Sequence, residues 1–265
     1  MHLLIIDPQE DFCNPHTGSL YVPGADADMV RLAGFIRKNP PDEITISLDT
    51  HQQMQIFHPC WWVDKTGLNP NPFTLIRAQD VKAKVWTTSR PEDQEWSEYY
   101  VNTLEQLGKF VLCIWPYHCI IGSTNHAVFS PLYSAITDWE RTKRRNVKYL
   151  IKGSNPYTEH YSALGPEIDY SSEETVRNPF TATSEDYVLD FLNADSLVIA
   201  GEALSHCLKL TVQDILKHKQ FIQNTNITLL LDATSGIPGF ESECAEFVNK
   251  IKTLGVVLKN TTDFN

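Results

Sequence analysis

The chain has 265 residues, of which 33 are acidic and 22 are Lys or Arg, so its formal net charge is −11. A protein that binds nucleic acid needs a basic face, and this composition therefore argues against a nucleic-acid partner. The first apolar run is interrupted by Asp7 and no run is long enough to span a bilayer, so we expect neither a secretory signal nor a membrane partner. The six cysteines include no CxxC pair, which indicates free thiols and a cytoplasmic protein.

Short β-branched or leucine-rich runs recur along the chain, and continuous apolar runs of this kind are typical of strands covered on both faces. They predict strands over 2–7, 43–49, 148–153, 195–201, 227–232 and 255–259. Amphipathic segments between them predict helices over 27–38, 184–194, 207–219 and 242–255. Alternating strands and helices predict an α/β fold, with a six-stranded, mostly parallel sheet and helices on both faces.

The interval between His58 and His118 does not fit this alternation, because it is rich in Pro, Trp and polar residues. A structureless loop of that length is improbable in a compact domain. We therefore expect a single domain over 1–265 with a cap-like insertion at about 59–114, which contains a helix near 97–108. A second irregular insertion is expected near 166–184.

Residues capable of catalysis or ligation follow the predicted strands, at the edge where doubly wound sheets gather function. Asp49 and His51 project from one face of their strand because they lie two residues apart. His58 follows within one loop and His118 lies in the segment WPYHC. An Asp with three His suits Zn²⁺, Fe²⁺ or Mn²⁺. The alternative is that Asp49 caps a turn and the histidines are scattered over the surface.

Cys207 is placed where the fourth predicted strand passes into a helix, and Ser205 can serve as the N-cap. A thiol in the first helical turn faces unpaired amides and the positive end of the helix dipole, which predicts a lowered pKa. The same amides could stabilise an oxyanion. Asp7 and Lys152 could then supply proton transfer and an orienting charge. The alternative is a cysteine that merely packs against the sheet.

Five segments together resemble the isochorismatase-like cysteine hydrolases, and among them most closely the nicotinamidases. They are LLIIDPQEDFC, SLDTHQ with FHP, WPYHC, IKGSNPYTEHYSA and AGEALSHCLKLTVQD, and they extend over nearly the whole chain. The resemblance implies a catalytic triad and a metal site, with His58 as a fourth ligand or bound through water. By position, the triad would be Asp7, Lys152 and Cys207, and the metal ligands would be Asp49, His51 and His118.

The resemblance also implies the substrate-binding groups. The backbone amides of Ala203 and Cys207 would form the oxyanion hole, with a cis peptide bond before Ala203, and Phe12 and Trp115 would enclose a pyridine ring. Three features depart from the family: the interval before His118 is long, Glu202 occupies a position that is commonly apolar, and Leu204 one that is commonly Thr.

These features lead us to expect a metal-dependent cysteine amidohydrolase. It would cleave nicotinamide, or a similar heteroaromatic carboxamide, to the acid and ammonia through a thioester. The expected cofactor is one divalent metal ion, Zn²⁺ before Fe²⁺ or Mn²⁺, and the expected partner is the small-molecule amide, with a homo-oligomer also allowed. The alternatives are an amidase or carbamoyl hydrolase of different substrate, or a non-catalytic binding protein on the same scaffold.

Overall fold

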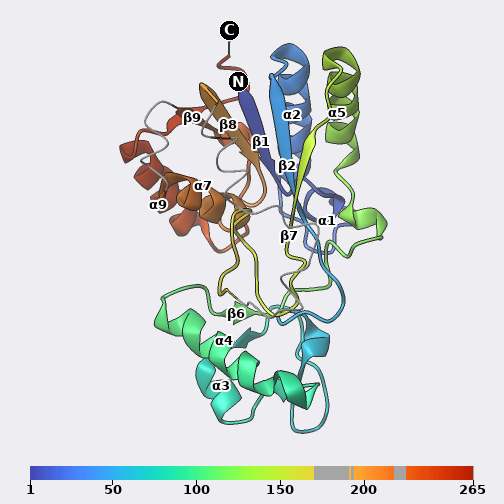
Figure 1. Cartoon of the computed structure of the whole chain (residues 1–265), viewed down its shortest axis with the longest axis vertical. Coiled ribbons are helices and arrows are strands. Elements are labelled where there is room, and N and C mark those ends of the chain that lie inside the picture. The colour runs from blue at the N-terminus through green and yellow to red at the C-terminus, as the bar shows by residue number, and fades with distance from the viewer. Residues whose placement is uncertain (170–190, 192–193, 218–224, 265) are drawn as a thin grey trace.

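The structure is a computed structural model that describes residues 1–169, 191, 194–217 and 225–264 (Figure 1). Its main sheet has six strands in the order β10-β9-β8-β1-β2-β7, and each pair of neighbours is parallel. The six-stranded sheet predicted from the sequence is thereby confirmed. The strands are β1 (His2–Ile6), β2 (Glu43–Asp49), β7 (Lys148–Lys152), β8 (Ser196–Gly201), β9 (Asn226–Leu230) and β10 (Val257–Lys259).

Helices cover both faces of this sheet, with α2 (Ala25–Lys38) and α5 (Ser130–Lys143) on one side and α7 (Cys207–Lys217) and α9 (Glu241–Thr253) on the other (Figure 1). Side chains alternate along each strand, so both faces must be apolar. In β1, Leu3 and Ile5 join the buried cluster of α2 and α5, whereas Leu4 and Ile6 join that of α7 and α9. Most of the helix predicted over 184–194, the end of that over 207–219 and most of the insertion near 166–184 lie outside the described residues.

The ends of the helices follow from local sequence. Helix α2 begins after Gly24, which has a left-handed φ of 100°, and carries acidic residues in its first turn and basic residues in its last. Both charge placements are favourable for the helix dipole. Helix α5 ends at Lys143, and its C-cap residue Arg144 is also left-handed with φ 55°, so the basic segment 140–148 includes the end of a helix.

The insertion at about 59–114 forms the cap, the lower lobe in Figure 1. The helix predicted near 97–108 is present as α4 (Gln94–Gln106). Trp61, Trp62 and Tyr100 are buried in the same cluster as Leu197 and Leu208 of the main body. An aromatic core therefore joins the cap to the sheet. The other elements of the cap are η1 (Pro59–Trp61), β3 (Trp62–Val63), β4 (Leu75–Ile76), α3 (Ala78–Lys82), β5 (Thr87–Thr88), η2 (Pro91–Asp93) and β6 (Leu112–Cys113).

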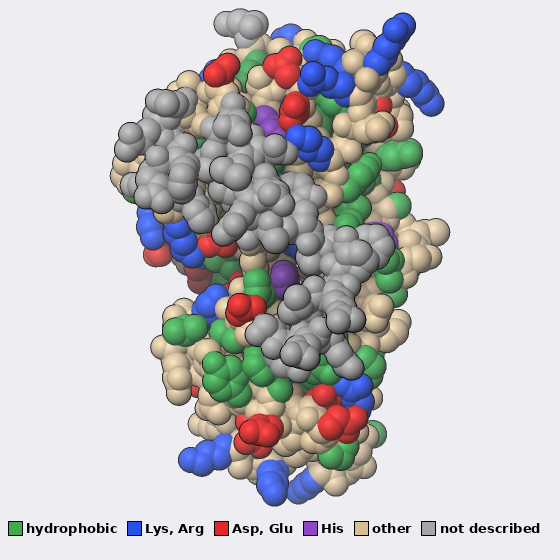
Figure 2. Space-filling view, viewed as in Figure 1, with side chains coloured by type: hydrophobic (Ala, Val, Ile, Leu, Met, Phe, Trp, Pro, Cys, Tyr) green, Lys and Arg blue, Asp and Glu red, His purple; other side chains and the backbone are tan. Residues whose placement is uncertain are grey.

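The surface carries charges of both signs. On the face shown in Figure 2, Lys and Arg side chains lie at both ends of the molecule with Asp and Glu side chains among them. Within the described part of the chain, no helix has the length and apolar character needed to cross a membrane.

The carboxyl ends of the parallel strands point toward the cap (Figure 1). Strand β1 lies between β2 and β8. The strands that follow β1 extend the sheet first on one side, through β2 and β7, and then on the other, through β8, β9 and β10, so the strand order reverses at β1. Ligands of doubly wound folds bind at such a switch point. Short elements complete this edge: α1 (Glu10–Cys13), η3 (Thr124–His126) and η5 (Leu231–Ala233).

Candidate functional site

Asp7, Lys152 and Cys207 meet at this edge of the sheet. Lys152, the last residue of β7, has its Nζ 2.9 Å from Oδ2 of Asp7 and 3.6 Å from Sγ of Cys207. The carbonyl of His160 accepts a further hydrogen bond from Nζ at 2.8 Å. Ser47 on β2 donates to Oδ1 of Asp7 at 2.6 Å, which fixes the carboxyl group. The three residues placed together by the strand pattern are therefore adjacent.

Burial governs how these groups ionise. It raises the pKa of Asp7, and the Lys152 cation only partly offsets this effect. Burial alone would lower the pKa of Lys152, but the carboxylates of Asp49 and Asp7 outweigh it, and the pKa lies well above its usual range. Lys152 is therefore a permanent cation, whereas Asp7 is a carboxyl group prepared to hold a proton.

The prediction of a lowered thiol pKa is wrong for this structure. Cys207 does begin α7, but it is buried, and burial raises its pKa well above the ordinary value. Lys152 opposes this increase, whereas Asp7 and Asp49 add to it. Desolvation is the largest cause of the shift. The thiol is therefore protonated at neutral pH and needs a base.

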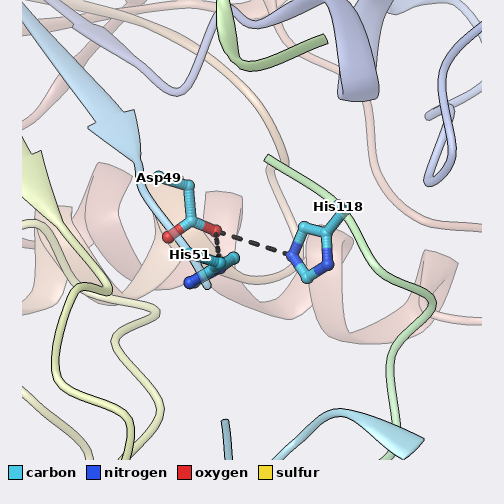
Figure 3. Close-up of side chains that lie close together, drawn as sticks. All are labelled: Asp49, His51 and His118. Carbon is cyan, nitrogen blue, oxygen red and sulfur yellow. Dashed lines mark ion pairs between the residues drawn. The ribbon is translucent and has the colours of Figure 1, made fainter. Parts of the chain in front are cut away.

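Asp49, His51 and His118 form the candidate metal centre, and one possible ligand atom from each lies within 4.8 Å of the others. Asp49 ends β2, and its Oδ2 lies 3.0 Å from Nε2 of His51 and 3.7 Å from Nε2 of His118 (Figure 3). His118 follows β6, the last element of the cap. The fold therefore brings it beside Asp49, although the whole cap separates the two residues in the sequence.

The hydrogen bonds of the histidines leave their Nε2 atoms available for a metal. Nδ1 of His51 bonds to the carbonyl of Gly153 at 2.9 Å, and Nδ1 of His118 to that of Pro116 at 2.8 Å. A carbonyl can only accept, so Nδ1 carries the proton and Nε2 presents a lone pair. The Nε2 of His51 thus faces a carboxylate oxygen as one acceptor facing another. A cation between them would satisfy both, and the residues therefore fit a divalent metal.

His58 lies beside this cluster rather than in it. Its ring centroid is 5.7 Å from that of His51 and 5.8 Å from that of His118. Its Nδ1 bonds to the carbonyls of Gln52 and Gln53, and its buried Nε2 has no hydrogen-bond partner in the described part of the chain. Burial lowers the pKa of His58 to about 3, so the ring is neutral. This placement suits a fourth ligand or one that acts through water.

Two residues absent from the predicted set hold the centre in place. The side chain of Gln9 donates to the carbonyl of Asp49 at 2.8 Å and accepts from its N–H at 2.7 Å. Gly153 has a φ of +77°, and a Cβ there would lie 2.5 Å from both Oδ1 of Asp49 and Cε1 of His51. Only glycine leaves room for these ligands. Both adjoin quoted motifs, DPQ and IKG, which is the signal that could have found them.

The candidate oxyanion-binding amides lie beside the thiol. The Glu202–Ala203 peptide bond is cis, as the resemblance implied. The N–H groups of Ala203 and Cys207 donate to no other group among the described residues. Ala203 accepts hydrogen bonds from His206 and Leu208, which connects this loop to the start of α7. Two free amides are thus available near Sγ, as an oxyanion hole requires.

One cavity is lined by the thiol of Cys207 and by Asp49 and His118 of the metal cluster. Trp115 donates through Nε1 to the hydroxyl of Tyr161 at 3.2 Å, and Phe12 packs edge-on against His118. Aromatic walls of this kind suit a flat ring. The lining residues are Phe12, Leu20, Val22, Asp49, Trp115, His118, Glu159, Tyr161, Glu202, Ala203, His206, Cys207 and Ile237.

Sequence reasoning did not assign two polar residues of this cavity. Burial raises the pKa of Glu159 well above its usual range, and its Oε2 has no hydrogen-bond partner among the described residues. Nδ1 of His206 lies 2.8 Å from Oγ of Ser205, and burial lowers the pKa of His206 to about 4. The signal for His206 was its place next to Cys207, whereas Glu159 gave none beyond its inclusion in YTEHYSA.

The fold was compared with known proteins. No family model matches the chain, and no curated protein matches it. Among solved structures, the yeast nicotinamidase has a TM-score of 0.64 at 21% identity, with 98% of this chain and 99% of that chain covered. The Acinetobacter baumanii nicotinamidase/pyrazinamidase has a TM-score of 0.61 at 19% identity, with 99% of this chain and 96% of that chain covered. The Pyrococcus horikoshii pyrazinamidase, solved in complex with zinc, has a TM-score of 0.56 at 18% identity, with 98% of each chain covered.

These likenesses extend over essentially the full length of each chain. The resemblance seen in the sequence is thus confirmed at the level of the fold. The chain has the fold of the nicotinamidases and pyrazinamidases.

Proposed function

We propose that this protein is a metal-dependent cysteine amidohydrolase that cleaves nicotinamide or a similar heteroaromatic carboxamide to the acid and ammonia. The observation that carries the proposal is the shared cavity. Cys207 and Ala203 line it together with Asp49 and His118, so a group that attacks a carboxamide and a group that could hold a ring nitrogen face one space. Phe12 and Trp115 line the same space and would pack on the ring.

The first half of the reaction forms the thioester. Asp7 takes the Sγ proton of Cys207, and the thiolate attacks the carboxamide carbon. The carbonyl π electrons move to oxygen, and the amides of Ala203 and Cys207 donate to this oxyanion. When the intermediate collapses, the C–N bond breaks and protonated Asp7 gives its proton to the leaving nitrogen, which departs as ammonia.

The second half releases the acid. Asp7, again ionised, takes a proton from water as the water oxygen attacks the thioester carbon. The C–S bond then breaks, and the proton on Asp7 returns to Sγ of Cys207. Lys152 stays charged throughout, because Asp49 and Asp7 both stabilise its cation. Its role is to orient Asp7 between the two proton transfers.

The metal would be held by Asp49, His51 and His118, with His58 at or near the fourth position. Neutral imidazole nitrogens and one carboxylate favour Zn²⁺, with Fe²⁺ and Mn²⁺ as alternatives. When bound, the ion supplies an attachment point for the ring nitrogen, which orients the carboxamide toward Cys207. The zinc in the pyrazinamidase from Pyrococcus supports this choice.

The test is ammonia release from nicotinamide by protein of known metal content, with Cys207→Ala and Cys60→Ala, a variant of a half-buried cysteine, in parallel. We expect turnover in the wild type and in Cys60→Ala, and none in Cys207→Ala. Failure of the wild type on nicotinamide with success on another aromatic carboxamide would favour a differently specific amidase. Equal ammonia release by Cys207→Ala and wild type would overturn the proposal.

A further inference from the structure

Glu202 is a buried acidic residue next to Ala203, at the start of the loop that leads from β8 to α7. It follows β8, precedes Ala203, and is 0% exposed while lining the cavity. Its Oε2 accepts a hydrogen bond from the N–H of Ser235 at 3.0 Å. Its Oε1 is buried and accepts no hydrogen bond from the described residues. The reaction scheme above gives this carboxyl group no role.

Hydrogen bonds hold the backbone on both sides of Ala203. The N–H of Glu202 donates to the carbonyl of Ile6 in β1 at 2.8 Å, and the N–H of Leu204 donates to the carbonyl of Ser235 at 2.8 Å. Ser235 therefore bonds twice to this loop, once through its carbonyl to Leu204 and once through its N–H to Glu202. The two hydrogen bonds of Ser235, to the Glu202 side chain and to the Leu204 N–H, thus complete a ring of atoms that includes the Ala203 backbone.

Ser235 also connects Glu202 to a second carboxyl group. Its Oγ donates to Oδ2 of Asp28 on α2 at 2.5 Å, and Asp28 forms an ion pair with Arg31. Within the described part of the chain, Asp28 and Arg31 from α2 and Cys13 from α1 interact electrostatically with Glu202, and Glu159, His206 and Cys207 line the same cavity. One buried cluster thus holds two carboxyl groups and one cation, and ionising both would leave a buried charge uncompensated.

Glu202 is the carboxyl group that stays neutral. Burial raises its pKa well above the usual range, and the nearby Asp28 charge raises it further. Asp28 forms an ion pair with Arg31 and accepts a hydrogen bond from Oγ of Ser235. Oε2 of Glu202 is the acceptor for the Ser235 N–H, whereas Oε1 has no hydrogen-bond partner among the described residues, so no bond stabilises a negative charge on that oxygen.

We propose that Glu202 is a positioning residue which, as a neutral acid bonded to Ser235 and adjoining Asp28, fixes the Ala203 and Cys207 amides for the oxyanion. This inference rests on the proposed amidase function. An oxyanion hole works only if its donors are held before the reaction begins. Ionised Glu202 would repel Asp28 and displace the loop, so turnover should fall at alkaline pH while substrate affinity changes little.

Two variants distinguish the effect of the ionisable carboxyl group from the effect of the hydrogen bond that it makes. Glu202→Gln keeps an acceptor for the Ser235 N–H but cannot ionise, whereas Glu202→Leu keeps the approximate size and loses this hydrogen bond. Glu95→Gln, on the exposed surface of α4, is the control for loss of a carboxyl group. The readouts are amide hydrogen exchange over residues 203–207, which needs no substrate, and the pH profiles of kcat and KM.

We expect Glu202→Leu to speed exchange over 203–207 and to lower kcat about 100-fold, with KM within about threefold of wild type. Glu202→Gln should match wild-type exchange and neutral-pH kcat, and should lose the alkaline fall in kcat that wild type and Glu95→Gln share. Unchanged exchange in Glu202→Leu, or an unchanged alkaline fall in Glu202→Gln, would overturn the inference. If Glu202→Leu does not fold, the profile of Glu202→Gln decides.

The two proposals fail in different ways. A wild-type protein that releases no ammonia from any aromatic carboxamide would refute the amidase function. The exchange comparison would still decide whether Glu202 orders the loop. Ammonia release with identical exchange and pH behaviour in all variants would retain the function and refute the role of Glu202.

Discussion

Nζ of Lys152 lies 3.0 Å from Oδ1 of Asp49, the residue whose other oxygen faces the metal-site histidines. The same Nζ contacts the catalytic candidate Asp7. One buried cation thus joins the triad to the metal centre. The cleavage machinery and the ring-orienting machinery are consequently held at a fixed separation by a single side chain.

Lys152→Met tests this connection. The substitution retains much of the side-chain length but leaves Asp7 and Asp49 without their shared cation in a buried site. We expect loss of activity and a decrease of about 3 kcal/mol in the free energy of unfolding, measured with urea. Lys250→Met, at an exposed position of α9, should change neither. Equal stability of the two variants would contradict the central role of Lys152.

Gly153→Ala tests the close packing behind the metal ligands. Its Cβ would collide with Asp49 and His51 at 2.5 Å, so we expect loss of bound metal and of activity. Gly67→Ala is the matched control, because Gly67 has a similar φ of +85° but no atom within 4 Å of the added Cβ. Both variants bear the cost of a left-handed alanine, about 1 kcal/mol. Normal metal content in Gly153→Ala would show that the ligands have room to move.

His51→Ala tests the composition of the metal centre. Removing a buried neutral imidazole should weaken metal binding at least about 100-fold and raise KM. We expect His58→Ala to have a smaller effect, since its ring lies beside the cluster, and His16→Ala, on the surface, to have none. Metal content per chain, measured after dialysis against a weak chelator, distinguishes them. Full metal retention by His51→Ala would remove it from the ligand set.

Glu202 also predicts how stability depends on pH. Its pKa in the folded state is raised above the ordinary value of 4.5, so the folded protein binds the proton more tightly than the unfolded chain. The stabilisation is complete below the unfolded pKa and is lost as the pH rises through the folded pKa. Relative to wild type, Glu202→Gln should therefore gain stability as the pH increases above about 4.5. A constant difference across the pH range would contradict a raised pKa.

The sequence predicted the strand-end residues well, because their positions follow from local pattern. Asp7, Asp49 and Lys152 each close an apolar run, and parallel strands bring such ends together. His118 is different, since the whole cap folds between it and β2. No local pattern determines where the chain returns after so long an insertion, so the residue types made His118 a candidate ligand and the family resemblance supported its place beside Asp49.

The chemistry of Cys207 shows what local pattern leaves out. The start of a helix at this residue was visible in the sequence, and with it the expectation of a lowered pKa. The depth of burial was not visible, because it depends on the cap and on the loops from four strands. Desolvation then reversed the direction of the shift. For the same reason, Glu202 appeared only as a departure from the family, and its link to Asp28 emerged from the tertiary structure.

The most direct test of the central claim is mass spectrometry of the protein after rapid acid quenching during turnover of nicotinamide. The account predicts a transient mass increase of one nicotinoyl group on the peptide that contains Cys207, with no such species in Cys207→Ala. Ammonia release without any acyl adduct on Cys207, or an adduct on another residue, would contradict the claim that this cysteine is the nucleophile.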